Sequence, residues 1–191
     1  MARPQSEDKR NAILSAATEV FALRGLGAPT SAISSAAGVA EGTLFTYFKT
    51  KDEMVNALYR EIKLELADAM MSGFPRRASI RNRLQHVWNS YTGWGIANPK
   101  QQKVLQQMGV WSGLTEESKR AGTAPFLEIE KTAEAAVAQH VFQDLPLEFI
   151  AAAMSALADT TMEFMRRQPK QASRYQSTGF EMLWAAVCRK K

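Results

Sequence analysis

The sequence of 191 residues is poor in features that would place it in a membrane or outside the cell. No apolar run approaches the roughly 20 residues that a membrane helix needs. The polar, charged N-terminus does not resemble a signal peptide. A single cysteine, Cys188, excludes an internal disulfide and any cysteine metal site, and it fits a reducing cytosol. We therefore expect a cytoplasmic protein that makes no use of a membrane.

The sequence also lacks a recognisable catalytic constellation. The two histidines, His86 and His140, lie far apart and have neither an HExxH motif nor a cysteine partner. The glycine-containing stretch 25–29 lacks the preceding strand and the Lys-Ser/Thr pair of a phosphate-binding loop. An enzyme is the first alternative to consider, and it finds no support here. We expect a protein that is not an enzyme and that holds no cofactor and no metal.

Runs of β-branched residues are absent, and glycine and proline stand at intervals that suit helix ends. With 46% apolar and 23% charged residues, the composition is that of a globular protein large enough to bury a core. The pattern predicts an all-α fold of about nine helices. We expect them over residues 6–25, 30–38, 40–48, 50–73, 79–97, 99–111, 115–137 with a break or kink at Gly122 and Pro125, 146–168 and 171–188.

The most informative stretch is residues 30–53, TSAISSAAGVAEGTLFTYFKTKDE. Thr30 is suited to cap a short helix, and Gly38 is suited to end it in a left-handed conformation. Leu44 and Phe48, spaced i and i+4, predict the buried face of a second short helix. The opposite face carries glycine, hydroxyl and aromatic side chains, which packing alone explains poorly. It is typical of the second helix of a helix-turn-helix, which lies in the DNA major groove.

The spacing of Thr30, Gly38-Val39, residues 42–45, Tyr47-Phe48 and Thr50-Lys51 resembles the DNA-binding signature of the TetR family of one-component repressors. The resemblance implies an N-terminal helix-turn-helix domain over residues 1–50 and a ligand-binding and dimerisation domain over residues 51–191. It implies backbone contacts from Thr30, Gly42, Tyr47 and Lys51, and base-edge contacts from Thr43, Phe45 and Thr46. Core packing is the alternative role for Phe45 and Tyr47.

Three departures from the family pattern concern phosphate contacts. Ala40 stands where many members have a capping serine, and Phe45 often corresponds to a tyrosine. Glu41 favours the helix dipole but repels the DNA backbone. The net charge of +5 does not compensate, because residues 1–60 carry seven basic against six acidic side chains. Charge alone therefore does not indicate DNA binding, and the prediction depends on the motif.

The sequence Thr50-Lys51-Asp52-Glu53 is a capping box that begins a helix of about five turns. About two residues join it to the predicted reading helix, so we expect it to link the two domains as a stiff lever. Ligand binding would shift the population toward a conformer in which this helix is displaced and the two reading helices no longer match the operator.

The last two predicted helices are rich in small residues, including 151–153, 155–156, Ala158, Gly179 and 185–186. Small residues let helices approach closely, and in the TetR family the last two helices pair with their copies as a four-helix interface. We expect a homodimer, because one short helix reads too few bases. The same residues would also suit an ordinary bundle core.

The middle of the chain carries many aromatic and methionine side chains. Together they suggest a broad pocket for lipophilic, often cationic or amphipathic compounds, although any single one suits a core equally well. The predicted wall consists of Tyr59, Trp88, Tyr91, Met108, Trp111, Phe126 and Met154. The candidates to pair with a cationic ligand are Asp159, Glu128 and Glu134. Each of them would equally suit an ordinary charged position on the surface.

Two further alternatives stay open at this level. The protein could bind DNA without a small-molecule ligand and use its C-terminal domain for dimerisation or a protein partner. It could also activate transcription, because the sign of regulation follows from the family alone. We expect a double-stranded DNA operator, a small lipophilic effector and a second copy of the chain as its partners.

Overall fold

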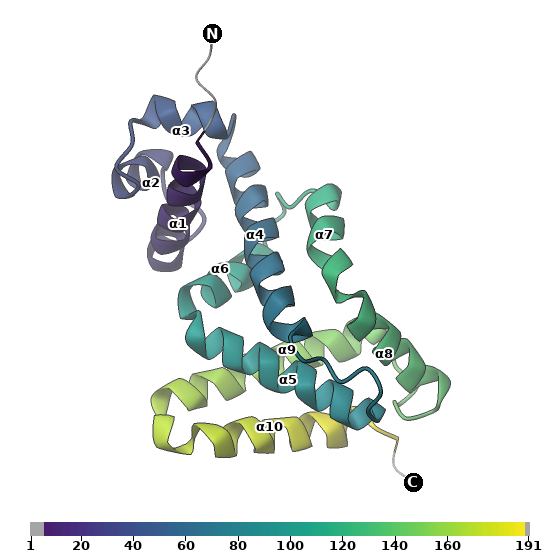
Figure 1. The fold of residues 1–191 in the computed structure, drawn as a ribbon. Helices are drawn as coiled ribbons and strands as arrows, with labels where there is room; N and C mark the ends of the chain where they lie inside the picture. The colour runs from purple at the N-terminus through teal and green to yellow at the C-terminus, as the bar shows by residue number, and fades with distance from the viewer. Residues whose placement is uncertain (1–5, 190–191) are drawn as a thin grey trace. The chain divides into compact units, whose positions relative to one another are not determined.

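The computed structural model describes residues 6–189, and it is all-α as predicted. Within this range the chain forms ten α-helices and two short 3-10 helices (Figure 1). They are α1 (Glu7–Arg24), α2 (Thr30–Ala36), α3 (Glu41–Tyr47), α4 (Lys51–Met71), α5 (Ile80–Ala97), α6 (Pro99–Gly109), α7 (Glu116–Thr123), η1 (Ala124–Phe126), α8 (Leu127–Ala138), α9 (Leu147–Arg167), η2 (Pro169–Gln171) and α10 (Ala172–Val187).

The ten α-helices exceed the predicted nine by one, because the helix predicted over 115–137 is divided into α7 and α8, with η1 between them. Pro125 lies in η1, where it separates α7 from α8. Gly122 does not break the helix. It lies inside α7, and a Cβ atom there would stand 2.6 Å from Cε1 of Tyr59. Gly122 therefore lets α7 approach α4 closely.

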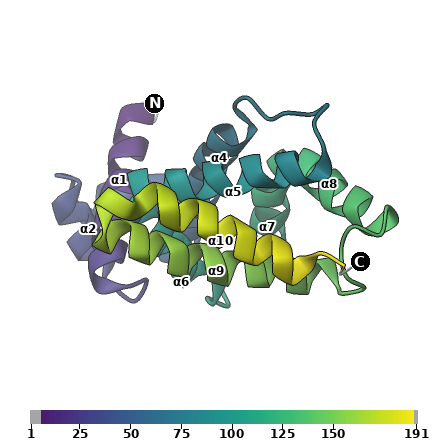
Figure 2. The same ribbon diagram turned by 90° about the horizontal axis from the view of Figure 1, so that it is seen from below.

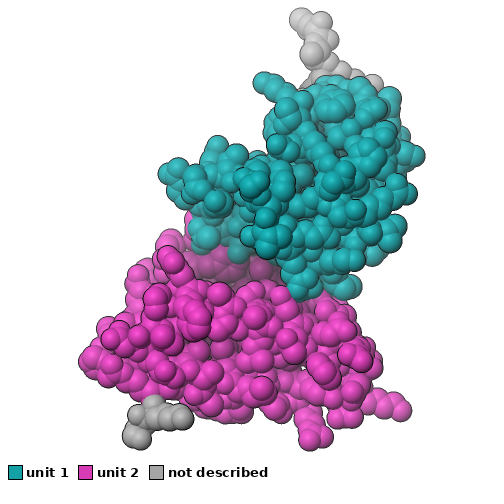
Figure 3. Space-filling model, turned by 180° about the vertical axis from the view of Figure 1, so that it is seen from behind, with its two compact units in different colours: residues 1–64, 98–123 teal, residues 65–97, 124–191 magenta. Residues whose placement is uncertain are grey.

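The chain divides into two compact units, coloured teal and magenta in Figure 3. Unit 1 comprises residues 1–64 and 98–123, and unit 2 comprises residues 65–97 and 124–191. The predicted boundary between residues 50 and 51 does not coincide with this division. Unit 1 takes in the first part of α4 together with α6 and α7, so sequence order alone does not separate the units.

The core of unit 1 is built on α1, which buries Ile13, Ala17 and Phe21 without exposure to solvent. Gly25 ends α1 with a φ of 82°, and its N–H donates to the carbonyl oxygen of Phe21 at 2.9 Å. This is the helix end that the sequence predicts. Further fully or almost fully buried side chains of this core are Ile33, Leu44, Phe48, Met54, Val55, Val104 and Met108.

Polar side chains of α4 tie the segment around α7 into unit 1. The Asn56 amide donates to the carbonyl oxygen of Gly113 at 2.9 Å, and its oxygen accepts from the Thr115 N–H at 2.9 Å. One turn later, the Arg60 guanidinium donates to the Ser118 hydroxyl at 2.6 Å. Asn56 and Ser118 are buried, so these bonds fix the register between α4 and α7.

The N-terminal cap of α4 confirms the predicted capping box. The Glu53 N–H donates to the Thr50 hydroxyl at 3.0 Å, as the motif requires. The Glu53 carboxylate accepts from the Lys49 N–H at 2.8 Å, one residue before the cap. Thr115 caps α7 in the same way, accepting from the Ser118 N–H at 3.1 Å.

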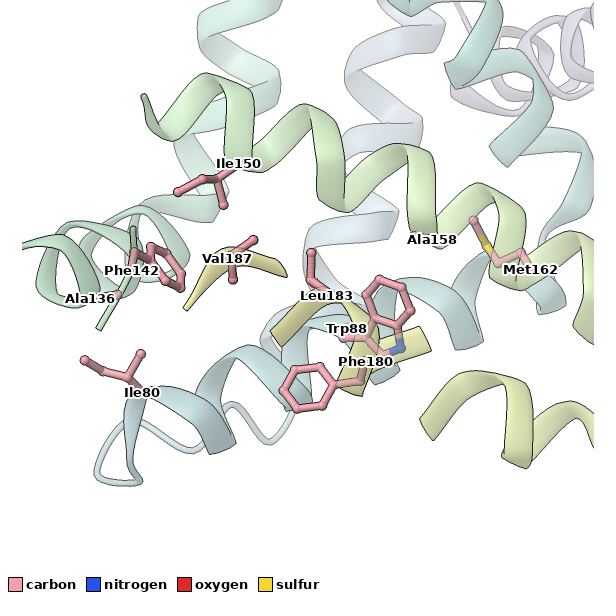
Figure 4. Packing of buried hydrophobic residues seen from close by; sticks show 10 residues of the cluster. All are labelled: Ile80, Trp88, Ala136, Phe142, Ile150, Ala158, Met162, Phe180, Leu183 and Val187. Carbon is pink, nitrogen blue, oxygen red and sulfur yellow. The ribbon is translucent and has the colours of Figure 1, made fainter. Parts of the chain in front are cut away.

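Unit 2 is a helical bundle in which η2 turns the chain so that α10 runs alongside α9 (Figure 2). Trp88 of α5 is completely buried in it, next to Phe180 of α10 (Figure 4). The indole N–H of Trp88 donates to the Gln176 carbonyl oxygen at 2.8 Å. A Cβ atom on Gly179 would stand 2.7 Å from Cζ2 of Trp88 and 2.5 Å from the hydroxyl oxygen of Thr161. Gly179 therefore serves the packing of this core, which was the alternative role for the small residues.

None of the helices in residues 6–189 combines the length and the hydropathy of a membrane-spanning segment.

Candidate DNA-binding surface and ligand cavity

The turn between α2 and α3 has the geometry that the sequence predicts. Gly38 has a φ of 66°, and its N–H donates to the Ser35 carbonyl oxygen at 3.2 Å. The Val39 N–H donates to the Ser34 carbonyl oxygen at 3.0 Å, which closes the turn. α3 then buries Leu44 without exposure. The glycine supplies the left-handed residue, and the apolar anchor fixes the orientation of α3 in unit 1.

The predicted capping role of Thr30 is wrong. Pro29 occupies the N-cap position of α2, and no side chain caps this helix. The Thr30 hydroxyl instead donates to the Glu41 carboxylate at 2.7 Å. A carboxylate is a stronger acceptor than any backbone group available here, and Glu41 stands at the start of α3 where it can reach back to α2. This bond joins the first turns of the two helices.

The outer face of α3 is exposed as predicted. Gly42, Phe45 and Thr46 are exposed, with 42% of Phe45 accessible to solvent, and Thr43 is half-buried. The Thr46 hydroxyl donates to the Gly42 carbonyl oxygen at 3.0 Å, within the helix. An exposed aromatic ring between hydroxyl groups costs solvation energy that a contact with a base or a thymine methyl would recover.

Tyr47 and Lys51 lie where the end of α3 meets the start of α4. The Tyr47 hydroxyl accepts from the Ser6 N–H at 3.0 Å, so its own O–H proton is available to donate to a phosphate. The Lys51 ammonium lies 5.8 Å from the centre of the Phe21 ring, a cation–π contact. Both side chains are half-buried. Core packing, the alternative considered for Tyr47, thus accounts for part of its surface.

All seven residues predicted to contact DNA belong to unit 1 and lie on α2, α3 and the start of α4. Sequence reasoning did not foresee that Glu41 holds Thr30 or that Ser6 holds Tyr47. The position of Glu41 in the first turn of α3 was a usable signal for the first of these bonds, because a long acid there can reach a neighbouring hydroxyl.

The seven residues predicted to line a ligand pocket are divided between the units. Tyr59, Met108 and Trp111 belong to unit 1, and Trp88, Tyr91, Phe126 and Met154 belong to unit 2. Met108 and Trp88 are fully buried in the cores of their own units. The other five are half-buried. Their assignment to one pocket stays a prediction.

A half-buried lysine, Lys63, accompanies Tyr59 on α4. Burial lowers the pKa of the Lys63 ammonium to about 8. Burial also raises the pKa of the Tyr59 hydroxyl, against the opposing charge of Lys119. Both side chains lie against α7, since a Cβ atom on Gly122 would come within 3.2 Å of each of them. The desolvated charge of Lys63 therefore weakens unit 1 at neutral pH.

Tyr91 of α5 interacts with two polar residues of α9. Burial and the negative charge of Asp159 raise the pKa of its hydroxyl, and a hydrogen bond with Ser155 acts in the opposite direction. Asp159 was one of the acids predicted as partners of a cationic ligand. In the structure it is a half-buried residue that acts on Tyr91.

Unit 2 contains a small apolar cavity of about 100 Å³. It is lined by Leu84, Ala133, Phe142, Leu147, Ile150, Ala151, Met154, Phe180, Leu183, Trp184 and Val187. Of the predicted pocket residues, Met154 lines it. The wall from α10 was missed, because the i, i+3, i+4 and i+7 spacing of its apolar residues in the sequence also describes a helix packed in a core. In Figure 4, Leu183 points from α10 toward the side of α9 that carries Ile150.

A wider groove of about 710 Å³ lies on unit 1, along α1, α2 and the start of α6. Its rim carries Arg24, Lys103 and the ion pair of Lys100 with Glu19. None of the residues predicted to bind DNA or ligand lines it. Its open form and mixed lining are those of a surface groove between helices, so we assign the apolar cavity of unit 2 as the candidate ligand site.

Comparison with known proteins finds a family match in the N-terminal part of the chain. Residues 13–58 match the family of bacterial regulatory proteins described as the tetR family. Over 84 residues the chain is 32% identical to the fatty acid metabolism regulator protein of Bacillus subtilis strain 168, a match that covers 44% of this chain and 43% of that protein. It is 33% identical over 84 residues to the HTH-type transcriptional regulator YhgD of the same organism. The matched stretch spans less than half the length of these relatives.

Solved structures extend the likeness to the whole fold. A tetR family regulator from Shewanella sp. PV-4 has a TM-score of 0.84 at 24% identity, covering 95% of this chain and 99% of its own. One from Marinobacter aquaeolei VT8 has a TM-score of 0.82 at 18% identity, covering 96% and 97%. FadR from Bacillus subtilis, solved in complex with stearoyl-CoA, has a TM-score of 0.67 at 19% identity, covering 91% and 96%. These likenesses show the fold and agree with the all-α prediction.

Proposed function

We propose that this chain, whose residues 13–58 match the tetR family of bacterial regulatory proteins, is a transcriptional repressor that a small lipophilic molecule releases from its DNA operator. Members of this family are DNA-binding transcription factors and not enzymes. The observation that carries the proposal is the exposed outer face of α3, where Phe45 and Thr46 stand over the buried anchor Leu44.

In this proposal α3 lies in the major groove. Thr43, Phe45 and Thr46 contact base edges, with Phe45 against a thymine methyl. The phosphate backbone is contacted, as the family resemblance implies, by Thr30, Gly42, Tyr47 and Lys51. The half-buried Tyr47 supports this division, because its oxygen is occupied by the Ser6 N–H and its O–H proton can donate.

The repressor would act as a homodimer on a palindromic operator. The support is an exposed stripe on α9 and α10 of unit 2, where Phe149 is 60% and Met182 is 56% exposed. Ala152 and Ala156 follow Phe149 at i+3 and i+7 on α9 and are exposed as well. Large apolar side chains that alternate with small ones suit a four-helix interface between two copies. Two α3 helices would then read half-sites about 34–36 Å apart.

The effector would occupy unit 2. Its apolar cavity suits a lipophilic molecule, and a structural relative, FadR of Bacillus subtilis, was solved with stearoyl-CoA. The blocks WNSYTGW (88–94), ADTTMEF (158–164) and GFEMLWAA (179–186) are similar to RamR, the enterobacterial regulator of multidrug efflux. From that similarity we infer a role in controlling a multidrug efflux pump or its regulator.

The ligand would act by a population shift. It binds one conformer better than the other and so weakens DNA binding by its differential affinity for the two. A coupling free energy of about 1–3 kcal/mol corresponds to a change of about 5- to 150-fold in operator affinity. α4 is the natural carrier, because it begins beside α3 and its residues belong to both units.

Fluorescence anisotropy of the protein on DNA from just upstream of its own gene, at several salt concentrations, tests the DNA-binding part. We expect saturable, sequence-dependent binding that weakens with salt. Thr46→Ala should weaken operator binding or relax its sequence preference. Thr123→Ala is the matched control, since Thr123 is an exposed helical threonine of unit 1 whose hydroxyl also donates to the carbonyl oxygen four residues earlier. Binding no tighter than to random DNA, or equal effects of both variants, would contradict the assignment.

The main alternative is a DNA-binding regulator without a small-molecule ligand, in which unit 2 serves dimerisation or a protein partner. Adding a panel of lipophilic compounds to the anisotropy assay separates the two. Release of the operator by any of them supports the repressor with an effector. Unchanged binding across a varied panel favours the alternative. A reporter gene under the operator then decides between repression and activation.

A further inference from the structure

One wall of the apolar cavity carries a positive charge on its outer side. Phe180 and Trp184 both line the cavity, and their rings stack with centroids 6.1 Å apart. The Arg81 guanidinium lies 5.4 Å from the centre of the Phe180 ring and 5.2 Å from that of Trp184. A single cation therefore covers two neighbouring aromatic side chains of the wall.

Arg81 is held there by an exchangeable partner. Its guanidinium donates to the Glu181 carboxylate at 2.5 Å, and the two side chains are 38% and 57% exposed. An ion pair this accessible to water contributes little to stability, so another carboxylate can replace Glu181 at small cost. A guanidinium also binds a carboxylate through two parallel hydrogen bonds, which favours a ligand with that group.

A second arginine, Arg83, is next in sequence to a lining residue of the cavity. Arg83 and Thr132 directly precede Leu84 and Ala133, which line the cavity, and the Arg83 guanidinium donates to the Thr132 hydroxyl at 3.4 Å. The Nε atom of Arg83 is buried and has no hydrogen-bond partner among the described residues. The two charged side chains that α5 places near the cavity are thus the cations Arg81 and Arg83. The described residues that line the cavity itself are all apolar.

The three acids predicted as partners of a cationic ligand are not positioned to pair with a ligand in the cavity. Glu128 pairs with Lys131 at 3.3 Å and with Arg76 at 3.9 Å, and Asp159 acts on Tyr91. Glu134 is exposed, and none of the three lines the cavity. A cationic ligand in the cavity would therefore meet Arg81, and it would have to displace Arg81 from Glu181 to gain an acid.

We propose that the effector is an anionic amphiphile, whose apolar chain enters the cavity of unit 2 and whose carboxylate replaces Glu181 on Arg81. The inference rests on the proposed effector-binding role of unit 2 and names the chemical class of its ligand. It replaces the preference for cationic compounds that the sequence suggested.

The cavity must open to admit such a chain. Its volume of about 100 Å³ is below the roughly 300–1,000 Å³ of most ligand pockets. Met154 and Trp184 line it and are half-buried, so they can turn outward more readily than the buried lining residues Phe142 and Ile150. An unbranched methionine adapts readily to a new occupant. Short single chains should therefore enter first.

The test uses octanoate, octanol and octylamine, which share one chain and differ in charge at pH 7, with binding to the full chain measured by isothermal titration calorimetry. We expect octanoate to bind about tenfold more tightly than octanol and octylamine to bind most weakly, as a charge-assisted hydrogen bond predicts. Arg81→Met should abolish the preference while keeping apolar contact with the two rings. Glu181→Gln should strengthen octanoate binding severalfold.

Arg76→Met is the matched control. Arg76 belongs to the same unit, pairs with Glu128 and lies 6.0 Å from the centre of the Phe74 ring, but it is not near the cavity wall. It should leave the preference for octanoate intact. Met154→Trp should fill the cavity and weaken octanoate and octanol alike, and Leu147→Phe provides a second filling variant if the first unfolds. Thermal melting verifies that each variant is folded.

Three outcomes would overturn the proposal: equal affinity for octanoate and octanol, a preference that survives Arg81→Met, and no binding of any of the three compounds at millimolar concentration. Operator binding by the same samples separates this failure from that of the proposed function. A protein that still binds its operator and is released by neutral or cationic compounds keeps that function and loses only the anionic ligand.

Discussion

Unit 1 and unit 2 are stabilised in different ways. In unit 1, polar side chains cross between helices: Asn56 and Arg60 of α4 hold the α7 segment, Arg10 pairs with Glu61 at 2.9 Å, and the Gln107 amide donates to the Phe21 carbonyl oxygen at 3.1 Å. In unit 2, such bonds join α5 to α10 at Trp88 and Gln176, whereas the rest of the buried interior is chiefly apolar and leaves a cavity.

The contrast matches what each unit is proposed to do. Directional hydrogen bonds fix helix positions, and a surface that reads base edges needs that precision. An apolar interior with free space can repack around ligands of several shapes at low cost, because van der Waals contacts are not directional. Substitutions should therefore have different effects in the two units, which the following experiments examine.

The largest effect is expected from Gly179→Ala in unit 2. The added methyl group would stand 2.5 Å from Thr161 and 2.7 Å from Trp88, so helices α9 and α10 must shift. We expect a loss of about 3 kcal/mol of stability, the upper end of the range for overpacked cores. Gly93→Ala, at an exposed position of α5, meets no atom within 4 Å and should instead stabilise by about 0.5–1 kcal/mol. Urea unfolding measures both, and changes of equal sign would contradict this account of the core.

Asn56→Ala should be the next most damaging. The substitution removes the side-chain partners of the Gly113 carbonyl and the Thr115 N–H. The Asn56 side chain that provides them belongs to a residue that is only 5% exposed. We expect a loss of about 2 kcal/mol, the cost of buried groups left without hydrogen bonds. Asn82→Ala, at an exposed position of α5, is the control and should change stability little. A loss below the error of urea unfolding would show that these cross-links do not stabilise unit 1.

Glu41→Gln should change function more than stability. The carboxylate accepts from Thr30, a predicted phosphate contact, and it repels the DNA backbone. Removing its charge should tighten operator binding about fivefold, since two charges 4 Å apart in water interact by about 1 kcal/mol. Anisotropy titrations at two salt concentrations measure this. Glu117→Gln, an exposed acid of α7, controls for net charge, and weaker binding by Glu41→Gln would mean that the bond with Thr30 organises the reading surface.

Lys63→Met should have the smallest effect. Because the pKa of Lys63 is lowered to about 8, the unfolded chain holds this proton between about pH 8 and 10.5 and the folded protein does not. Unfolding then takes up a proton, so the free energy of unfolding rises with pH in this window. Below pH 8 the buried charge costs stability, at most about 3 kcal/mol and about 1 kcal/mol after allowing for water access. The Lys63→Met protein should be more stable than the unsubstituted protein at pH 7. Its free energy of unfolding should lack the rise between pH 8 and 10.5.

The sequence was sufficient for the fold and for the local geometry of α2, α3 and the start of α4, because both depend on local rules. The left-handed Gly38, the buried pair Leu44 and Phe48 and the capping box at Thr50 act within a few residues, and the structure has each of them. Such signals can be read without knowing which helices meet in space.

The cavity and the unit boundary could not be read in the same way. The apolar spacing of Phe180 and Leu183 is the same in a filled core and around a cavity, and only the packed structure separates the two. Gly122 and Gly179 looked like a helix breaker and an interface residue, yet both allow a large side chain to rest on a backbone. Such contacts join residues far apart in sequence, and periodicity does not report them.

The division into units has a consequence for building chimeric regulators. The chain passes from one unit to the other at residues 64/65, 97/98 and 123/124, so unit 1 is completed by α6 and α7 from the middle of the sequence. A reading domain cut at residue 50 and fused to a foreign sensor would bring none of these helices with it. The foreign protein would have to supply its own equivalents of Gly113, Thr115 and Ser118 if the transplanted segment included Asn56 and Arg60. Exchange of specificity between such regulators should therefore succeed most readily by replacing the exposed face of α3 alone.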